Sequence, residues 1–296
     1  MTAAPYGGTH DGSDHGSEHV SERISEHVWR LRLPSRTLPP FDHINVYLVA
    51  SNGVAVVVDP GSPDEDAVRA TDAALAAAGV RLLKAVLLTH THRDHVEGVA
   101  ALVAAHDDCP VYVHPLEAER LTSAVRTVAL AGDRRIAVGD ATVRSVHTPG
   151  HSPGHLAFLV EEDAVALAGD LVAGRGSSWV GAPEGDVADY LESLERLRAL
   201  APACLAPGHG PLVDDPDAKL VEAGEHRRER ERQVVRALAA GATDLGTLRQ
   251  RIYPSLPRPA HDLAERSLLA HLHKLMREMR VLHLGEDPSG PYALRR

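Results

Sequence analysis

Residues 82–95 read LLKAVLLTHTHRDH, an apolar run that leads directly into three histidines and an aspartate. The apolar run predicts a strand buried on both faces. In a loop that leaves such a strand, His90 and His92 can point to one side and converge on one ion. Asp94 and His95, half a turn further on, then face a neighbouring position. By residue type and spacing, this segment predicts a metal-binding cluster at the carboxyl end of a buried strand.

Three further candidate ligands follow, each at a strand-to-loop junction beside glycine or proline. They are His151 in the sequence TPGH, Asp170 in AGD and His209 in PGHG. Glycine lets the backbone pass close to a ligand and adopt a positive φ. Each signal is weak when taken alone, but their joint order after the histidine cluster predicts that all of them belong to one site.

The composition is consistent with a use for imidazole, because the 296 residues include 19 histidines but only 10 aromatic residues. The net charge of −10 argues against a protein that coats nucleic acid or an anionic membrane. No stretch has the length of uncharged apolar sequence that a membrane span needs, and the first residues lack the apolar core of a secretory signal. With two cysteines, Cys109 and Cys204, we expect a cytoplasmic protein without a disulfide framework.

The predicted elements indicate two folded domains behind a polar tail. Residues 1–25 have almost nothing to bury and are expected to be disordered. Residues 26–215 mix strands and helices without strict alternation, which favours an α+β or layered αββα catalytic domain. Its predicted strands are 28–33, 45–50, 54–59, 82–88, 111–114, 143–147, 155–160, 164–168 and 204–206, and its predicted helices are 64–78, 96–105 and 186–200.

Residues 216–296 have a different pattern, with helices predicted at 219–240, 244–253 and 262–280 and a hairpin of 281–284 with 292–294. Three helices followed by a β-wing is the order of a winged helix-turn-helix. Residues 217–296 carry a charge of +4, whereas residues 1–216 carry −14. One face of the third helix is basic and carries Arg266, His273, Arg277 and Arg280, with Lys274 beside it. This face either contacts nucleic acid or belongs to a module that packs over the active site or forms a dimer.

The motifs HTHRDH, TPGH, AGD and PGHG, which cover roughly residues 40–212, resemble the metallo-β-lactamase superfamily. The resemblance implies a four-layer αββα sandwich with a two-metal site. Carried over to this chain, it implies that His90, His92 and His151 hold one ion, that Asp94, His95 and His209 hold a second, and that Asp170 bridges both. Asp59, in the sequence VDPG, is similar to an early family carboxylate that would fix a histidine tautomer; an ordinary turn carboxylate is the alternative.

Five histidines and two aspartates favour Zn²⁺ by ligand type, while iron and manganese stay open. Two divalent ions at such a site bind a shared water and lower its pKa, and the resulting hydroxide attacks an electrophilic carbon or phosphorus. Asp94 is the candidate catalytic residue, because it can ligate a metal and also orient the nucleophile or accept its proton.

The winged order after this domain is similar to the LACTB-2-like branch of the superfamily, which implies hydrolysis of small acyl compounds or cleavage of single-stranded RNA. We expect an ester or thioester first, because TPGHSPGH also resembles the glyoxalase-II-like hydrolases. The C-terminal segment also holds only Tyr253 and Tyr292 for stacking on bases. RNA cleavage is the alternative. More distant hypotheses are an iron redox enzyme and a metal-sensing regulator that binds DNA. We expect no membrane partner, and a homodimer is compatible with the sequence.

The histidines outside these motifs have weaker signals. His155, four residues after His151, either lines the substrate cleft or caps the following strand. His114 and His147 fall on predicted strands and are expected to pack rather than to bind metal.

Overall fold

The computed structural model describes residues 21–107, 109–121 and 125–295, so most of the expected disordered tail lies outside the described residues. Its expected end at residue 25 is wrong. Ser21–Arg23 form a strand, β1, which pairs antiparallel with β2, Val28–Pro34. The first sheet therefore begins before residue 26.

Seven strands form this first sheet in the order β1 to β7, antiparallel as far as β4 and parallel from β4 onwards. The remaining strands are β3 (His43–Ser51), β4 (Val54–Val58), β5 (Leu82–Leu87), β6 (Val111–Val113) and β7 (Thr127–Ala129). The turn between β3 and β4 is Asn52-Gly53, with both residues at positive φ. Because β4 and β5 are parallel neighbours, the segments that follow them emerge at the same edge of the sheet.

Five strands form the second sheet in the order β12-β11-β10-β9-β8. They are β8 (Arg135–Val138), β9 (Ala141–His147), β10 (Leu156–Val160), β11 (Val165–Gly169) and β12 (Cys204–Pro207). Only the outermost pair, β11 with β12, is parallel. The carboxyl ends of these two strands therefore lie together, and they lead into Asp170 and into the segment that carries His209.

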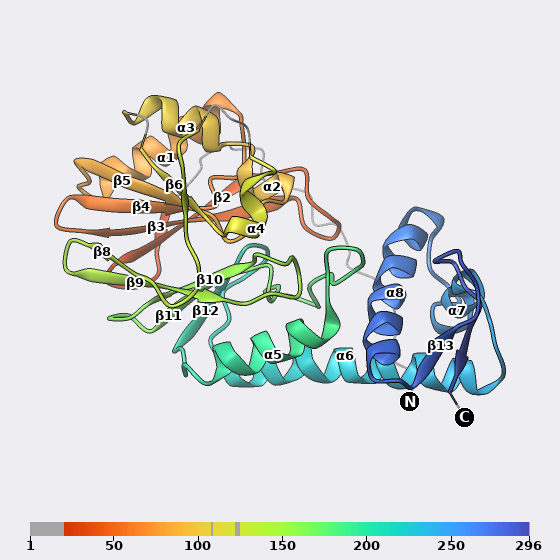
Figure 1. Ribbon diagram of the computed structural model, residues 1–296. Helices are drawn as coiled ribbons and strands as arrows, with labels where there is room; N and C mark the ends of the chain where they lie inside the picture. The colour runs from red at the N-terminus through yellow and green to blue at the C-terminus, as the bar shows by residue number, and fades with distance from the viewer. Residues whose placement is uncertain (1–20, 108, 122–124, 296) are drawn as a thin grey trace.

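The hydrophobic core confirms the four predicted layers (Figure 1). Helices α1 (Glu65–Ala77) and α3 (Val99–Ala105) pack on the outer face of the first sheet. A second cluster of buried residues fills the space between the two sheets. A third lies under α5 (Val187–Arg198) and the first half of α6 (Pro216–Ala239), on the outer face of the second sheet. Three apolar interfaces thus separate four layers, in the order helix, sheet, sheet, helix.

The helix predicted at 96–105 is instead two short helices, α2 (Arg93–Val96) and α3. Gly98 separates them, and a Cβ on this residue would lie 2.2 Å from the Pro60 carbonyl oxygen. This close approach of two backbones requires glycine. As a consequence, Asp94 and His95 lie in a helical turn of their own beside the loop that follows β4. A further short helix, α4 (Pro115–Ala118), was not predicted from the sequence.

The C-terminal segment has the predicted winged order. Helices α7 (Leu245–Ile252) and α8 (His261–Arg277), joined through a 3₁₀ turn at Arg258–Ala260, precede the antiparallel pair β13 (Val281–His283) and β14 (Tyr292–Leu294). Helix α6 belongs to both parts of the molecule. Leu220 and Ala223 pack in the cluster under the second sheet, whereas Val234 and Leu238 pack in the core of the winged module. The two parts therefore share a continuous helix across the expected boundary at residue 216 (Figure 1).

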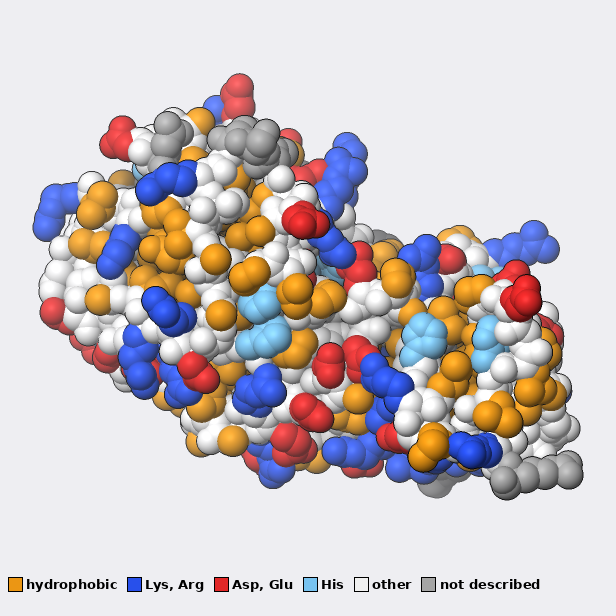
Figure 2. All heavy atoms as spheres, viewed as in Figure 1, with side chains coloured by type: hydrophobic (Ala, Val, Ile, Leu, Met, Phe, Trp, Pro, Cys, Tyr) orange, Lys and Arg blue, Asp and Glu red, His pale blue; other side chains and the backbone are white. Residues whose placement is uncertain are grey.

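Charged side chains of both signs are interspersed over the face of the molecule in Figure 2. Among the helices of the described residues, none is long and apolar enough to cross a membrane.

Candidate metal centre

The centre begins where β4 and β5 end side by side. Asp59 directly follows β4 with a positive φ of 52°. Its carboxylate accepts hydrogen bonds from the Thr89 backbone N–H at 2.8 Å and hydroxyl at 2.6 Å. A third hydrogen bond at 2.8 Å joins the carboxylate to Nδ1 of His95. Asp59 therefore joins the loop that carries His90 and His92 to the helical turn that carries His95.

One group of three imidazoles converges as predicted. Nδ1 of His92 lies 2.9 Å from Nε2 of His90 and 2.9 Å from Nε2 of His151. The three ligand atoms come from two different loops, after β5 and after β9, and lie within 4.8 Å of one another. Three nitrogens that face one inner point suit a single cation, because neutral imidazole offers a lone pair there.

A second group of three lies beside it and contains Asp94, His95 and His209. Nε2 of His209 is 3.2 Å from Oδ2 of Asp94. Nε2 of His95 is fully buried, and among the described residues it has no hydrogen-bond partner. An orphaned buried nitrogen is costly, but it is a suitable ligand atom for a metal ion.

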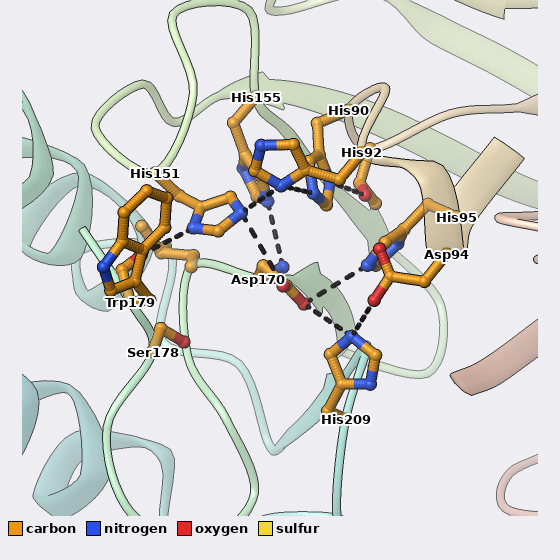
Figure 3. A network of polar contacts seen from close by, with 12 residues as sticks. His90, His92, Asp94, His95, His151, His155, Asp170, Ser178, Trp179 and His209 are labelled. Carbon is orange, nitrogen blue, oxygen red and sulfur yellow. Dashed lines mark hydrogen bonds and ion pairs between the residues drawn. The ribbon is translucent and has the colours of Figure 1, made fainter. Parts of the chain in front are cut away.

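Asp170 lies between the two groups (Figure 3). One carboxylate oxygen is 3.5 Å from Nε2 of His95 and 3.6 Å from Nε2 of His209, and the other is 3.6 Å from Nε2 of His151. Each oxygen thus faces a different group. This is the arrangement required of a carboxylate that bridges two ions.

The outer nitrogens of the histidines have hydrogen-bond partners. Nδ1 of His151 lies 2.7 Å from the Trp179 carbonyl oxygen, and Nδ1 of His209 lies 2.8 Å from that of His43. Nε2 of His92 lies 3.2 Å from a carboxylate oxygen of Glu184. Such partners fix the tautomer, so that the inner nitrogen keeps its lone pair for a cation.

Sequence reasoning missed these three partners. A backbone carbonyl has no signature in the sequence, and the Glu184 carboxylate reaches His92 only because residues 92 apart meet in the fold. Arg120 pairs with the same carboxylate at 2.8 Å and so holds it in position.

The charges within the centre are strongly coupled. Burial lowers the pKa of His90 well below its ordinary value, and the neighbouring imidazoles act in the same direction. Burial opposes ionisation of Asp170, but the imidazoles of His209 and His95 hold the pKa of that carboxyl well below its usual range. Burial opposes protonation of His95 and His209, but the Asp170 carboxylate raises the pKa of both imidazoles. A bound cation would displace these ring protons, because metals bind neutral imidazole and ionised carboxylate.

His155 lies beside the backbone of Asp170, and its side chain is not exposed to solvent. Its Nε2 accepts a hydrogen bond at 3.1 Å from the backbone N–H of Asp170. Its Nδ1 lies 2.9 Å from the Thr148 hydroxyl. His114 and His147 stack on each other, with ring centroids 4.4 Å apart, away from the two ligand groups. Cys109 packs in the core beside the first sheet, and Cys204 begins β12.

All seven ligands expected from the sequence therefore meet in one place, and their donor types and orientations fit two divalent cations. The orphaned nitrogen of His95, the facing lone pairs of His90, His92 and His151, and the central Asp170 all fit this assignment.

Comparison with known proteins identifies the two parts of the chain. Residues 39–209 match the metallo-β-lactamase superfamily, and residues 247–289 match the β-lactamase-associated winged helix domain. The chain is 27% identical over 245 residues to the β-lactamase-like protein 2 homolog of Drosophila melanogaster, covering 79% of this chain and 82% of that protein. It is 29% identical over 252 residues to an atrochrysone carboxyl ACP thioesterase of Aspergillus fumigatus, covering 79% of this chain and 75% of the relative.

Among solved structures, a β-lactamase domain protein from Burkholderia ambifaria superposes with a TM-score of 0.81 at 25% identity, covering 94% of each chain. Its likeness extends over both parts of the molecule. The chain therefore belongs to the metallo-β-lactamase superfamily, whose members are hydrolases that typically bind divalent metals, and it carries the winged-helix domain associated with that superfamily.

Proposed function

We propose that the protein is a two-metal hydrolase, with zinc as its metal, that acts on a small acyl ester or thioester. The observation that carries this proposal is the position of Asp170 between two groups of three ligands, with one oxygen toward each group. Divalent cations held there would supply a Lewis acid and would lower the pKa of a bound water.

Residues of the chain orient the ligand nitrogens and the nucleophile. His151, His209 and His95 each present one nitrogen inward because a partner outside the centre holds the other nitrogen. The carboxylate of Asp94 lies at the rim, with 15% of its side chain exposed, whereas the side chain of His95 is fully buried. Asp94 is therefore the carboxylate best placed to orient the nucleophile and to accept its proton.

Two observations favour an acyl substrate over RNA. The thioesterase relative aligns with both parts of the chain. In addition, cations on or beside the basic face expected on α8 are neutralised by neighbouring carboxylates. Lys274 and Arg280 both pair with Glu231, at 2.6 and 2.7 Å, and Arg277 pairs with Asp186 at 2.7 Å. Cations that are already paired attract a polyanion weakly, and the catalytic part is itself acidic.

The test is a paired assay of the metal-loaded full chain on a panel of acyl thioesters and on a single-stranded RNA oligonucleotide. We expect thioester hydrolysis, reduced about a thousandfold or more in Asp94→Ala. The control His106→Ala removes an imidazole that pairs with Asp72 outside the centre, and it should keep full activity.

RNA cleavage that is lost in Asp94→Ala, without any thioester hydrolysis, would establish the alternative substrate. Metal analysis should find about two equivalents of zinc per chain; less than one equivalent, or iron alone, contradicts the two-zinc proposal. A cytoplasmic location and a homodimer remain predictions from the sequence.

A further inference from the structure

A cavity of about 440 Å³ lies between the catalytic part and the winged module. One wall is the segment from Gly176 to Trp179, and the others come from α6, the end of α7 and α8. The segment also borders the metal centre, because the carbonyl of Trp179 is the partner of His151 (Figure 3). The cavity and the centre are therefore neighbours that share one wall.

The arginines of α6 divide by the side of the helix on which they lie. Arg228, Arg232 and Arg236 each pair with a glutamate, at 3.0, 2.7 and 2.6 Å. Arg227 and Arg230 line the cavity, and neither forms an ion pair with a carboxylate of the described residues. The arginines on the other side of the helix find glutamate partners, so the lack of a carboxylate partner is specific to the two arginines that line the cavity.

Arg227 is only 4% exposed. Its guanidinium donates to the Ser177 hydroxyl at 2.9 Å and to the Ser178 carbonyl, and it lies 5.2 Å from the centre of the Tyr190 ring. Its Nε is buried, with no hydrogen-bond partner among the described residues. A buried guanidinium held by neutral groups alone keeps an uncompensated charge.

Arg230 reinforces that charge. It lies 4.1 Å from the centre of the Tyr253 ring and donates to the Gln233 amide oxygen at 2.6 Å, both of which are neutral. The carboxylate in the lining, Glu222, lies 3.0 Å from the ammonium of Lys219, which already neutralises it.

The excess of positive charge also lowers the pKa values of two nearby histidines. Burial, reinforced by Arg227 and Arg230, lowers the pKa of His226 to about 4 and that of His271 to about 3. His226 lines the cavity, and its Nδ1 lies 3.3 Å from the Ser177 hydroxyl. Near neutral pH both imidazoles are therefore uncharged, and the positive charge is concentrated on the two arginines.

We propose that this cavity binds a carboxylate or phosphate group, held by Arg227 and Arg230, and that the acyl substrate carries this group. The second half of the proposal rests on the function proposed above. An anion there would supply the missing counter-charge, and planar guanidinium groups suit bidentate contact with either group. The volume suits a small organic anion, and the cavity lies beside the metal centre, because Trp179 contributes to both.

Binding is tested first, without catalysis. Calorimetric titration of the metal-loaded full chain with succinate and with inorganic phosphate should detect binding that Arg230→Gln weakens about tenfold. Arg228→Gln is the matched control, because Arg228 lies half a turn away on the same helix and pairs with Glu225. Absence of binding by either anion, or an equal loss in both variants, would overturn the anion site.

Kinetics then test whether the substrate carries the anion. Succinyl and butyryl thioesters of N-acetylcysteamine are matched in length and differ in the terminal carboxylate. Arg230→Gln should raise the KM for the succinyl thioester about tenfold more than the KM for the butyryl thioester, whereas Arg228→Gln should leave the ratio unchanged.

An equal change in KM for both thioesters would contradict the proposal that the substrate carries the anion, but it would not contradict the anion site itself. If neither thioester is hydrolysed, the proposed function fails, but the titrations still decide the anion site. Arg227→Lys keeps the positive charge and loses the planar fork; anion affinity equal to that of the unchanged protein would contradict recognition by guanidinium.

Discussion

The two polar clusters on either side of the Ser177–Trp179 segment lack opposite kinds of hydrogen-bonding group. In the metal centre, the ring nitrogens of His90, His92 and His151 face one another, and in the described part of the chain no acidic or basic side chain with several donors lies between them. In the cavity between the domains, two arginines lie together without a carboxylate partner among the described residues. The first cluster has an excess of acceptors and suits cations, whereas the second has an excess of donors and suits an anion. The local deficit of charge, rather than the number of polar residues, indicates the chemistry of each site.

The largest effect should follow the loss of the carboxylate shared by the two ligand groups. Asp170→Ala removes the oxygens that face both groups, so we expect the bound metal to fall by one equivalent or more and activity to drop about a thousandfold or more. Metal analysis and thioester assay measure this. The control His106→Ala lies outside the centre; full metal content in Asp170→Ala would refute the bridging role.

A smaller effect is expected from the residue that orients a ligand without touching the metal. Asp59→Asn replaces one acceptor oxygen by an NH₂ group, which cannot accept the ring N–H of His95. We expect affinity for zinc to weaken by about 10- to 100-fold, measured by competition with a chelator.

Asp72→Asn is the matched control for that variant, because it alters an aspartate–histidine pair with His106 at the surface of the fold. If both variants bind zinc as the unchanged protein does, Asp59 is an ordinary turn residue.

The positive charge beside the cavity should appear in the pH dependence of stability. His271 is buried and faces the charges of Arg227, Arg230 and Lys274, so its pKa falls to about 3 in the folded protein. The unfolded chain binds the proton near pH 6.5 and the folded protein does not. Stability therefore decreases as the pH falls from about 6.5 toward 3, by up to about 1.4 kcal/mol per pH unit for this group.

Urea unfolding at pH 7, 6 and 5 measures this decrease. His271→Leu keeps the side chain buried and removes its proton, so its free energy of unfolding should decrease less steeply over this range. His106→Leu, at a partly exposed site, serves as the control. Parallel pH profiles for His271→Leu and the unchanged protein would show that folding does not lower the pKa of His271.

The smallest effect is expected where the two parts of the molecule meet through an exposed ion pair. Arg277→Ala removes the pair with Asp186, which also caps the first turn of α5. With about half of the arginine side chain exposed, the loss of stability should stay below about 1 kcal/mol. Arg266→Ala, which breaks a pair with Asp262 within α8, should cost a similar amount. A much larger loss for Arg277→Ala would show that this pair holds the module in place.

Much of the fold and of the metal centre could be predicted because their signals are local. The apolar run before His90 predicted a buried strand, and glycine beside His151, Asp170 and His209 predicted loops close to a ligand. These features depend on neighbours within a few residues. The short helix α2 was missed because Gly98 is constrained by contact with Pro60, which lies 38 positions earlier in the chain.

The cavity between the domains could not be predicted at all. In the sequence, EHRRERER at 225–232 has a glutamate near every arginine and is typical of a solvated helix face. Only the packing of α6 against the second sheet and against α8 separates the arginines that find glutamates from Arg227 and Arg230, which do not.

By itself, the sequence determined the types of ligand, their order and their place at strand ends, because side-chain chemistry and short-range spacing are properties of the chain. The tertiary structure alone decided which nitrogen of each histidine faces inward, which partners hold the other nitrogen, and where a buried charge lacks a counter-charge. Those properties depend on hydrogen bonds and burial between residues as far apart as His43 and His209, and such contacts form only when the sheets and helices pack together.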